Sequence, residues 1–350
     1  MKKTLLAVAI PALLASGAAS ATTLYDNNGT KVDIKGSIRI ALTYSDARDA
    51  AGEDGTKFKD VGSRFGFKVT HDLGDGLYGL GELEYGNNTQ SGHDNFGLEN
   101  RLGYVGLGLD GVGEFTFGRV LSPFDDVAMS DYSYDYGGIL AFGHGVAKGA
   151  GDSIISRTSN TAKFMSADFS GFSFGATYTT QGEWGKESDV NVRNGYTLSG
   201  FYDSGFGLKV NAGYGHAKID KTADRNVDIW GVSTEYTVDA LSFAFDIGHA
   251  QDKKDAGKEK AMLYGVGAKY NLGKANVYAG YYLSDTNNNV TELKEKHTIV
   301  VGTDYQFTPS VRTYVEYANV DMKHRNGFTS ETSKDYKDEN KAMVGMRVYF

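Results

Sequence analysis

The chain contains no cysteine, only three prolines and no long apolar run after residue 21. Without cysteine, disulfides cannot stabilise the fold, and thiolate metal sites are excluded. Apolar stretches beyond residue 21 fall short of about 18 residues, so no membrane-spanning helix is expected there. The chain also lacks an excess of positive charge, and its formal net charge of −8 argues against nucleic acid as a partner.

The first 21 residues have the composition of a cleavable signal peptide. Two lysines precede an apolar run over residues 5–14, and a cleavage site of small residues ends at Ala21. A run of about ten residues is roughly half of what a membrane-spanning helix needs. We therefore expect residues 1–21 to direct export and to be removed, which leaves residues 22–350 as a single domain.

Glycine, tyrosine and phenylalanine are abundant, with 46, 23 and 19 copies. Aromatic residues favour twisted strands and also occupy the boundary between water and lipid. In the final segment, residues 341–350, Arg347 and Tyr349 lie opposite an apolar face. That face contains Ala342, Val344, Met346, Val348 and Phe350. The pattern is typical of a strand with lipid on one side and water on the other.

Sixteen segments with this alternation are separated by two kinds of connection that take turns along the chain. Seven connections are short and rich in turn residues, such as Asp110-Gly111. Eight are long: residues 46–62, 86–100, 119–153, 180–195, 216–226, 250–260, 284–296 and 318–340. A soluble β-sandwich has no reason to keep two classes of connection. The alternation therefore predicts an all-β fold, a 16-stranded antiparallel transmembrane β-barrel.

Charged residues in these segments fall on the face opposite the apolar residues. In the first strand, residues 32–44, Arg39 lies opposite Ile38. The same alternation assigns to the polar face Arg64, Lys68, Glu82, Glu84 and Arg101. Leu102 and Tyr104 fall on the lipid face. A lipid-facing charge near the midplane costs about 2–4 kcal/mol, so the charges predict a water-filled interior, and sixteen strands enclose a channel that side chains cannot fill.

Several short motifs follow one another in a defined order. They are Lys31-Val32-Asp33-Ile34, Ser63-Arg64-Phe65-Gly66-Phe67-Lys68, Asn100-Arg101-Leu102-Gly103-Tyr104, Phe117-Gly118-Arg119, Asp135-Tyr136-Gly137-Gly138 and the terminal Tyr349-Phe350. In this order they resemble the general trimeric porins of Gram-negative outer membranes, of the enterobacterial osmoporin type. The resemblance covers all of residues 22–350.

This resemblance implies a homotrimer in the bacterial cell outer membrane, in which each barrel has a third loop folded inward. It implies a water-filled channel for passive diffusion of small hydrophilic solutes and ions, with no enzyme activity, cofactor or metal. The expected partners are outer-membrane lipid and lipopolysaccharide, together with the barrel-assembly machinery. That machinery is expected to read Phe350 as the assembly signal.

The family narrows its pore between an arginine-rich wall and an acidic third loop. Arg64 and Arg101 match the family's wall positions, and Arg157 matches at the start of the strand after the third loop. Ser37 replaces the family's lysine in the first strand, and Arg39 is the residue expected to restore that charge. The further lumenal wall residues are Lys68, Glu82 and Glu84.

The third loop, residues 119–153, is the longest connection, and connections of this length are usually functional or disordered. Asp131 and Asp135 match the family's two acidic positions, whereas Tyr134 replaces a proline. Facing rows of opposite charge create a transverse field that favours small polar solutes over apolar ones. These six residues, the four arginines and the two aspartates, form the predicted pore constriction.

Arg119 differs from the other arginines because it shares parity with Phe115 and Phe117 and is expected to face outward. We interpret it as a subunit-contact residue. Asp94 or Glu99 in the second loop of a neighbouring barrel is expected to cover its charge.

Two alternative functions share parts of this pattern. A substrate-specific channel needs a run of lumenal aromatics, and alternation assigns only a few, such as Phe201, Tyr278 and Tyr282. A barrel enzyme needs a histidine beside a serine or an acid, and the seven histidines lie mostly in turns and loops without metal-ligand spacing. Recognition by phage or antibody is compatible with each of these functions. The acidic net charge favours cations and the arginines favour anions; from the sequence alone we expect a weak cation preference.

Overall fold

The computed structural model describes eight stretches of the chain. They are residues 21–87, 98–138, 152–183, 191–219, 225–254, 257–288, 292–324 and 338–350. Residues 1–20 of the predicted signal peptide, and Asp94, lie outside these stretches. Within them, no helix is long and apolar enough to cross a membrane.

Eighteen strand segments form one sheet. They are β1 (Thr22–Asn27), β2 (Thr30–Ser45), β3 (Thr56–Asp60), β4 (Arg64–Gly74), β5 (Leu77–Asn87), β6 (Leu98–Leu109), β7 (Gly113–Leu121), β8 (Arg157–Ser166), β9 (Phe172–Glu183), β10 (Asn191–Asp203), β11 (Leu208–Ile219), β12 (Arg225–Val238), β13 (Leu241–Lys254), β14 (Gly257–Asn271), β15 (Ala275–Asn288), β16 (Glu292–Thr308), β17 (Val311–His324) and β18 (Glu339–Tyr349). The described helices are short: α1 (Asp46–Ala50), the 3-10 helix η1 (Pro123–Asp126) and α2 (Asp152–Ile155).

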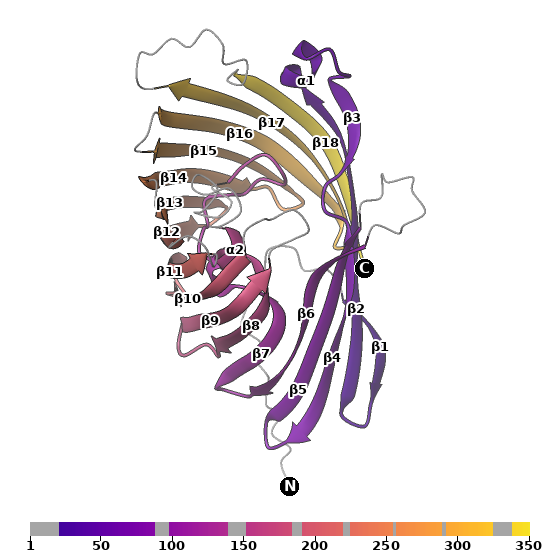
Figure 1. The fold of residues 1–350 in the computed structure, drawn as a ribbon. Helices are drawn as coiled ribbons and strands as arrows, with labels where there is room; N and C mark the ends of the chain where they lie inside the picture. The colour runs from indigo at the N-terminus through magenta and orange to yellow at the C-terminus, as the bar shows by residue number, and fades with distance from the viewer. Residues whose placement is uncertain are drawn as a thin grey trace.

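The sheet closes on itself because β18 pairs with β2 (Figure 1). β3 and β4 pair with successive halves of β2 and so make up one barrel strand, and β1 pairs with the start of β2 in line with β18. The eighteen segments therefore form sixteen barrel strands, and the predicted 16-stranded antiparallel barrel is confirmed. Neither β1 nor the split between β3 and β4 is predicted from the sequence.

Several strands extend further than the alternation of apolar residues indicates. The connection predicted at residues 250–260 is mostly strand, since the β13–β14 ladder continues to the pair Lys254 and Gly257. The predicted connections at residues 216–226 and 284–296 shorten in the same way. Backbone pairing needs no apolar side chain, so the ladders continue after the strands lose their apolar residues.

The two faces of the wall differ in what covers them. In β17, Val315 and Tyr317 are exposed on the outer face, whereas Tyr314 and Glu316 on the inner face are each only 1% exposed. The inner face is buried because the segment after β7 packs against it. Phe124 and Val127 of that segment join a cluster of buried wall residues that includes Ile229. The core of this barrel therefore lies inside it, between the wall and the third loop.

The last residue completes the closing seam. Phe350 exchanges two backbone hydrogen bonds with Gly36, at 2.8 and 3.1 Å, and its ring lies where a side chain at position 36 would be. A Cβ added to Gly36 would lie 2.5 Å from the ring and 2.9 Å from the Arg64 carbonyl oxygen. Glycine is therefore required at this position by close approach.

We expect Gly36→Ala to weaken the seam, because overpacking of this kind costs about 1–3 kcal/mol. The measurement is the temperature at which the folded barrel loses its fast migration in an unboiled detergent gel. Gly79→Ala is the matched control, since a Cβ there meets nothing within 4 Å. Equal melting of the two variants would contradict the close-approach argument.

Candidate functional site

Charged side chains form continuous rows on the inner face of β2, β4 and β5. Lys68 pairs with Asp33 on one side and with Glu82 on the other. Glu82 also forms an ion pair with Lys35 Nζ at 2.5 Å and accepts a hydrogen bond from the Tyr104 hydroxyl at 2.9 Å. Lys68 and Glu82 thus lie on the same face of the wall and belong to one network.

Tyr104 corrects the predicted orientation of β6. Alternation placed Leu102 and Tyr104 on the lipid face, but the Tyr104 hydroxyl bonds to the lumenal Glu82. A β-bulge between the pairs Glu84–Leu102 and Tyr85–Asn100 adds one residue to β6, and that residue is Arg101. The bulge breaks the period of two, so Arg101 and Tyr104 both reach the inner side.

Five arginines, which we call the arginine row, line one side of the lumen: Arg39, Arg64, Arg101, Arg157 and Arg347. Arg39 pairs directly with Arg347 across β2 and β18, and Arg64 pairs with Ser37 of β2. Arg64 is repelled electrostatically by Arg101, Arg39 and Arg157. The four predicted arginines therefore lie close enough to act on one another, and Arg347 adds a fifth.

Few carboxylates neutralise the arginine row. Arg101 Nε donates to Glu84 Oε1 at 2.7 Å. Arg39 Nε donates instead to the Ser37 hydroxyl at 2.7 Å, and Arg64 Nε to the Gly62 carbonyl at 3.2 Å. In the described part of the chain, Glu84 is the one carboxylate that forms a direct ion pair with the row.

The third loop, which structurally connects β7 and β8, is attached to the inner wall by two carboxylates. Asp246 of β13 accepts from the Met129 amide at 3.0 Å and from the Ser130 hydroxyl at 2.6 Å. Glu316 of β17 accepts from the Tyr134 amide, the Asp135 amide at 3.1 Å and the Tyr136 amide at 3.4 Å. These bonds hold the loop along the wall from β13 to β17.

Tyr134, which stands where the family has a proline, contacts three side chains of the wall. Its ring stacks on Tyr314 at 4.3 Å, and the Arg347 guanidinium lies over it at 4.4 Å. Arg347 also donates to the Tyr134 carbonyl at 2.8 Å, and Arg312 donates to its hydroxyl at 2.9 Å. Tyr134 thus attaches the loop to both β17 and β18.

The two predicted loop acids have different environments. Asp131 accepts from the Ser133 amide at 2.8 Å and the Ser133 hydroxyl at 2.7 Å, and the Tyr282 hydroxyl lies 3.4 Å away. Asp135 is a quarter exposed and pairs with Lys59 Nζ at 3.1 Å. Among the described residues, neither acid forms an ion pair with the arginine row. Asp131 stabilises a turn of the loop, and Asp135 is the one that reaches the lumen.

Two further acids lie at the base of the loop. Desolvation by the surrounding barrel and the neighbouring Asp126 carboxylate raise the pKa of the exposed Asp125 to about 6, although Arg157 and Arg101 act in the opposite direction. Desolvation also raises the pKa of Asp126, against the attraction of Lys163. The charge on Asp125, close to Arg157, therefore changes in the mildly acidic range.

Arg119 lies at a second bulge, between Gly118 and Val120 in β7. It donates to the Asn100 carbonyl at 3.0 Å and to the Ser159 hydroxyl at 3.1 Å. The Arg119 guanidinium thus has two hydrogen-bond acceptors within its own barrel. Its role in subunit contact stays a prediction.

Lys59, Asp246, Arg312, Glu316 and Arg347 are site residues that sequence reasoning did not assign to the constriction. The alternation of apolar and polar residues in the sequence does indicate that Glu316 and Arg347 face inward. It cannot indicate that Glu316 binds the loop, because its partners lie about 180 residues away in the chain.

Removing the Glu316 carboxylate is expected to loosen the loop, since hydrogen bonds to a charged group contribute about 1.5–3 kcal/mol each. Glu316→Ala is expected to increase open-channel current noise and the size of polyethylene glycol that enters the pore. Glu235→Gln, which weakens one bond to the loop at the Tyr132 hydroxyl and a longer ion pair with Lys209 on the wall, is the graded control. A Glu316→Ala channel as quiet and as narrow as the control would show that the loop does not depend on this carboxylate.

A model of the Gram-negative porin family matches residues 5–325. The "Major outer membrane protein" of Pasteurella multocida is 31% identical over 100% of both chains.

Two solved structures share the fold at lower identity. An anion-selective porin from Comamonas acidovorans superposes with a TM-score of 0.78 at 21% identity, over 92% of this chain and 100% of that one. The trimer form of OmpT, an outer membrane protein of Vibrio cholerae, superposes with a TM-score of 0.72 at 21% identity, over 92% of this chain and 100% of that one.

Proposed function

Because the chain belongs to the Gram-negative porin family and is a β-barrel of the outer membrane, we propose that its channel passes small hydrophilic solutes and ions by passive diffusion through a charged constriction. The observation that carries the proposal is the row of Arg39, Arg64, Arg101 and Arg157 on the inner wall, together with a loop that is hydrogen-bonded to the wall at β13, β17 and β18. Between them, a polar solute can exchange water for charged groups, whereas an apolar solute cannot.

The balance of charge in the constriction supports a weak preference for anions. Asp246 and Glu316 are each 1% exposed because they lie beneath the loop, Asp131 accepts hydrogen bonds from Ser133, and Asp135 is paired with Lys59. The arginine row keeps more charge than its one paired carboxylate offsets. This local excess opposes the acidic net charge of the whole chain, which by itself favours cations.

A substrate-specific channel is supported less well. Tyr278, Tyr282 and Tyr314 are lumenal but at most 6% exposed, because the third loop covers them. Solutes in the channel therefore meet no exposed run of aromatic rings from these residues.

The same proposal extends to assembly. Three barrels associate as a homotrimer, as the Vibrio cholerae structure in trimer form does, and Arg119 lies at the subunit contact. Residues 1–21 act as the signal peptide, and the barrel-assembly machinery reads Phe350. Exposed apolar side chains on β5, β6 and β7 support a protein-covered or lipid-covered outer face; they include Leu83, Val105, Leu107, Phe115 and Phe117.

Arg64→Ala tests the constriction. Two unit charges about 8 Å apart in water interact by about 0.5 kcal/mol, so removing one guanidinium changes the permeability of anions and of cations about twofold each in opposite directions and is expected to lower the anion-to-cation ratio about fivefold. The measurement is the reversal potential of the channel in a planar bilayer with a salt gradient. Lys274→Ala, in an exposed turn between β14 and β15, is the control and is expected to leave the ratio unchanged. An unchanged ratio in Arg64→Ala would place the arginine row outside the conduction path, and a barrel that passes no ions would refute the porin proposal itself.

Asp125 is expected to make selectivity depend on pH. Lowering the pH from 7.5 to 5 crosses a pKa of about 6, so Asp125 loses its negative charge and anion preference increases. Asp125→Asn is expected to abolish the change in the anion-to-cation permeability ratio between pH 7.5 and pH 5. Asp135→Asn is expected to change the ratio at pH 7.5 but to keep the change between the two pH values. If the permeability ratio of Asp125→Asn still changes between pH 7.5 and pH 5, another group is responsible for the pH dependence.

A further inference from the structure

Three arginines lie side by side across the closing seam of the barrel. Arg312 is opposite Arg347 in the β17–β18 ladder, and Arg347 is opposite Arg39 in the β18–β2 ladder. Directly opposed residues of antiparallel strands have Cα atoms about 4.5–5.5 Å apart, so the three side chains form one short row on the inner face. We call Arg39, Arg312 and Arg347 the seam arginines. Like charges directly opposite one another destabilise a sheet, so this row calls for negative charge beside it.

The described part of the chain supplies the seam arginines with one carboxylate. Asp304 Oδ1 lies 3.7 Å from Arg312 Nε and forms their one ion pair. Glu84 also attracts Arg39, but its own ion pair is with Arg101. Three guanidiniums and one carboxylate leave the row with a net charge of +2.

The hydrogen bonds of the seam arginines use neutral oxygen atoms and leave further N–H groups to donate. Arg39 Nε donates to the Ser37 hydroxyl at 2.7 Å, and Arg347 donates to the Tyr134 carbonyl at 2.8 Å. Arg312 donates to the Tyr134 hydroxyl at 2.9 Å. Arg347 Nε is buried and has no acceptor among the described residues. Because a buried donor without an acceptor costs free energy, this N–H group points to an acceptor that the chain itself does not provide.

The seam arginines lie near the end of the barrel that carries the short turns. Arg312 is the second residue of β17, which follows a short turn, and Arg347 lies close to the chain end at Phe350. Figure 1 shows the C-terminus beside β2 at this end of β18. A quarter of the Arg312 side chain is exposed. A solute in the lumen can therefore reach the row at the periplasmic end of the channel.

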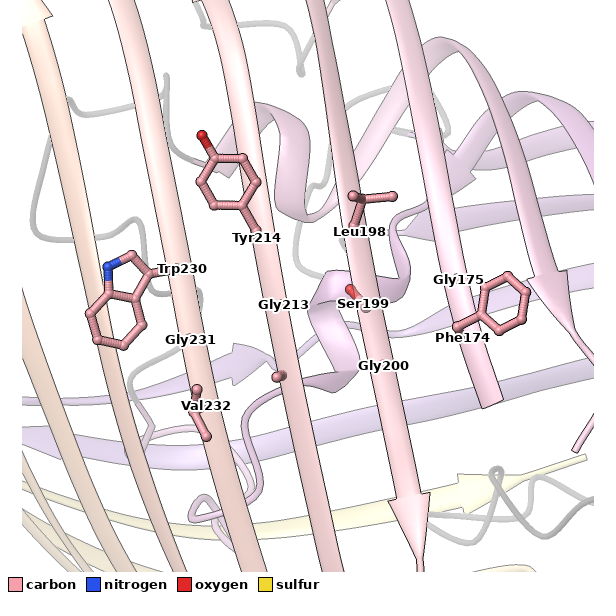
Figure 2. A pocket seen from close by; sticks show the side chains of 11 residues that line it. Phe174, Gly175, Leu198, Ser199, Gly200, Gly213, Tyr214, Trp230, Gly231 and Val232 are labelled. Atoms are coloured by element: carbon pink, nitrogen blue, oxygen red, sulfur yellow. The ribbon is translucent and has the colours of Figure 1, made fainter. Parts of the chain in front are cut away.

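A hollow of about 390 Å³ on the outer face of β9–β12 has the opposite chemistry (Figure 2). Phe174, Leu198, Trp230 and Val232 are among the residues that line it, and no residue of its lining is charged. An anion there would lose its hydration without gaining a charged partner, which is unfavourable. The seam arginines supply both the charge and the N–H groups that such an anion needs.

We propose that the seam arginines bind a dianionic tetrahedral oxyanion, phosphate or sulfate, at the periplasmic end of the channel. Two negative charges match the net charge of the row. A planar guanidinium presents its N–H groups as a fork to a pair of oxygen atoms, which a tetrahedral oxyanion offers on several sides and a halide does not. The site rests on the proposed channel function, because the oxyanion reaches it through the lumen that conducts ions.

Saturable block of the chloride current tests the site. In a planar bilayer bathed in a chloride salt, added sulfate or phosphate is expected to lower the chloride current to a plateau, since a bound dianion offsets the positive charge that attracts chloride. Arg312→Gln is expected to raise the half-blocking concentration about tenfold, because a charge-assisted contact is lost. Arg193→Gln removes an exposed arginine of β10 and is the matched control, and folding of both variants is checked by mobility in unheated gels.

The outcomes of this experiment separate the site from the channel. Equal half-blocking concentrations in the two variants, or a native channel without saturable block, would overturn the oxyanion site while chloride conductance still supports the porin proposal. A native barrel that conducts no ions would instead refute the channel itself.

Tyr134→Phe separates oxyanion binding from attachment of the third loop. This change removes the hydroxyl that accepts from Arg312 and keeps all three guanidiniums. The half-blocking concentration is therefore expected to stay at its native value. A rise that matches that of Arg312→Gln would assign the effect to the loop and overturn the proposal.

Perchlorate separates the charge of the anion from its shape, because it is tetrahedral and carries a single negative charge. It is expected to block far less than sulfate at the same concentration. Equal block by perchlorate would overturn the requirement for a dianion. Phosphate and sulfate are titrated separately, and the lower half-blocking concentration identifies the preferred one of the two.

Selenate locates the anion without any variant, because it is a dianionic tetrahedral oxyanion with a strong anomalous scatterer. Crystals of the native barrel soaked in selenate are expected to show an anomalous peak among the three guanidiniums of the seam arginines. No peak there, or a peak only beside Arg64 and Arg101, would overturn the assignment. A peak of equal height in crystals of Arg312→Gln would indicate an adventitious ion only.

Discussion

Hydrocarbon offers no hydrogen-bond partner, so every backbone amide and carbonyl that crosses the membrane must be paired within the protein. This barrel meets that constraint by joining β18 to β2, and Phe350 itself exchanges two backbone bonds with Gly36. Once the sheet is closed, alternate side chains must face either lipid or lumen. The charged inner face, the loop that packs on it and the apolar outer face all follow from this closure.

Local departures from the regular ladder decide which charges meet. The bulge in β6 brings Arg101 to the inner face and keeps Tyr104 there, where it bonds to Glu82. The bulge in β7 places Arg119 between the Asn100 carbonyl and Ser159. Without the extra residue in β6, strict alternation would place Arg101 and Tyr104 on opposite faces, and one of them would face lipid. Two of the predicted site residues, Arg101 and Arg119, therefore lie at irregularities of the barrel.

The carboxylates of the inner wall have two distinct uses. Glu84 offsets an arginine, whereas Asp246 and Glu316 accept hydrogen bonds from the loop backbone. Asp246 and Glu316 lie under the loop and are each 1% exposed. Tyr134 adds a guanidinium–aromatic stack with Arg347. Arg347 thus belongs both to the loop attachment and to the arginine row.

The sequence by itself determined the class of fold, the number of barrel strands and the inward side of Arg39, Arg64, Lys68 and Glu82, because a period of two is a local property of a strand between two solvents. Only the tertiary structure decided the bulge at Arg101, the turn-forming environment of Asp131 and the loop contacts of Glu316. Those depend on register and on residues far apart in the chain, which no local pattern encodes.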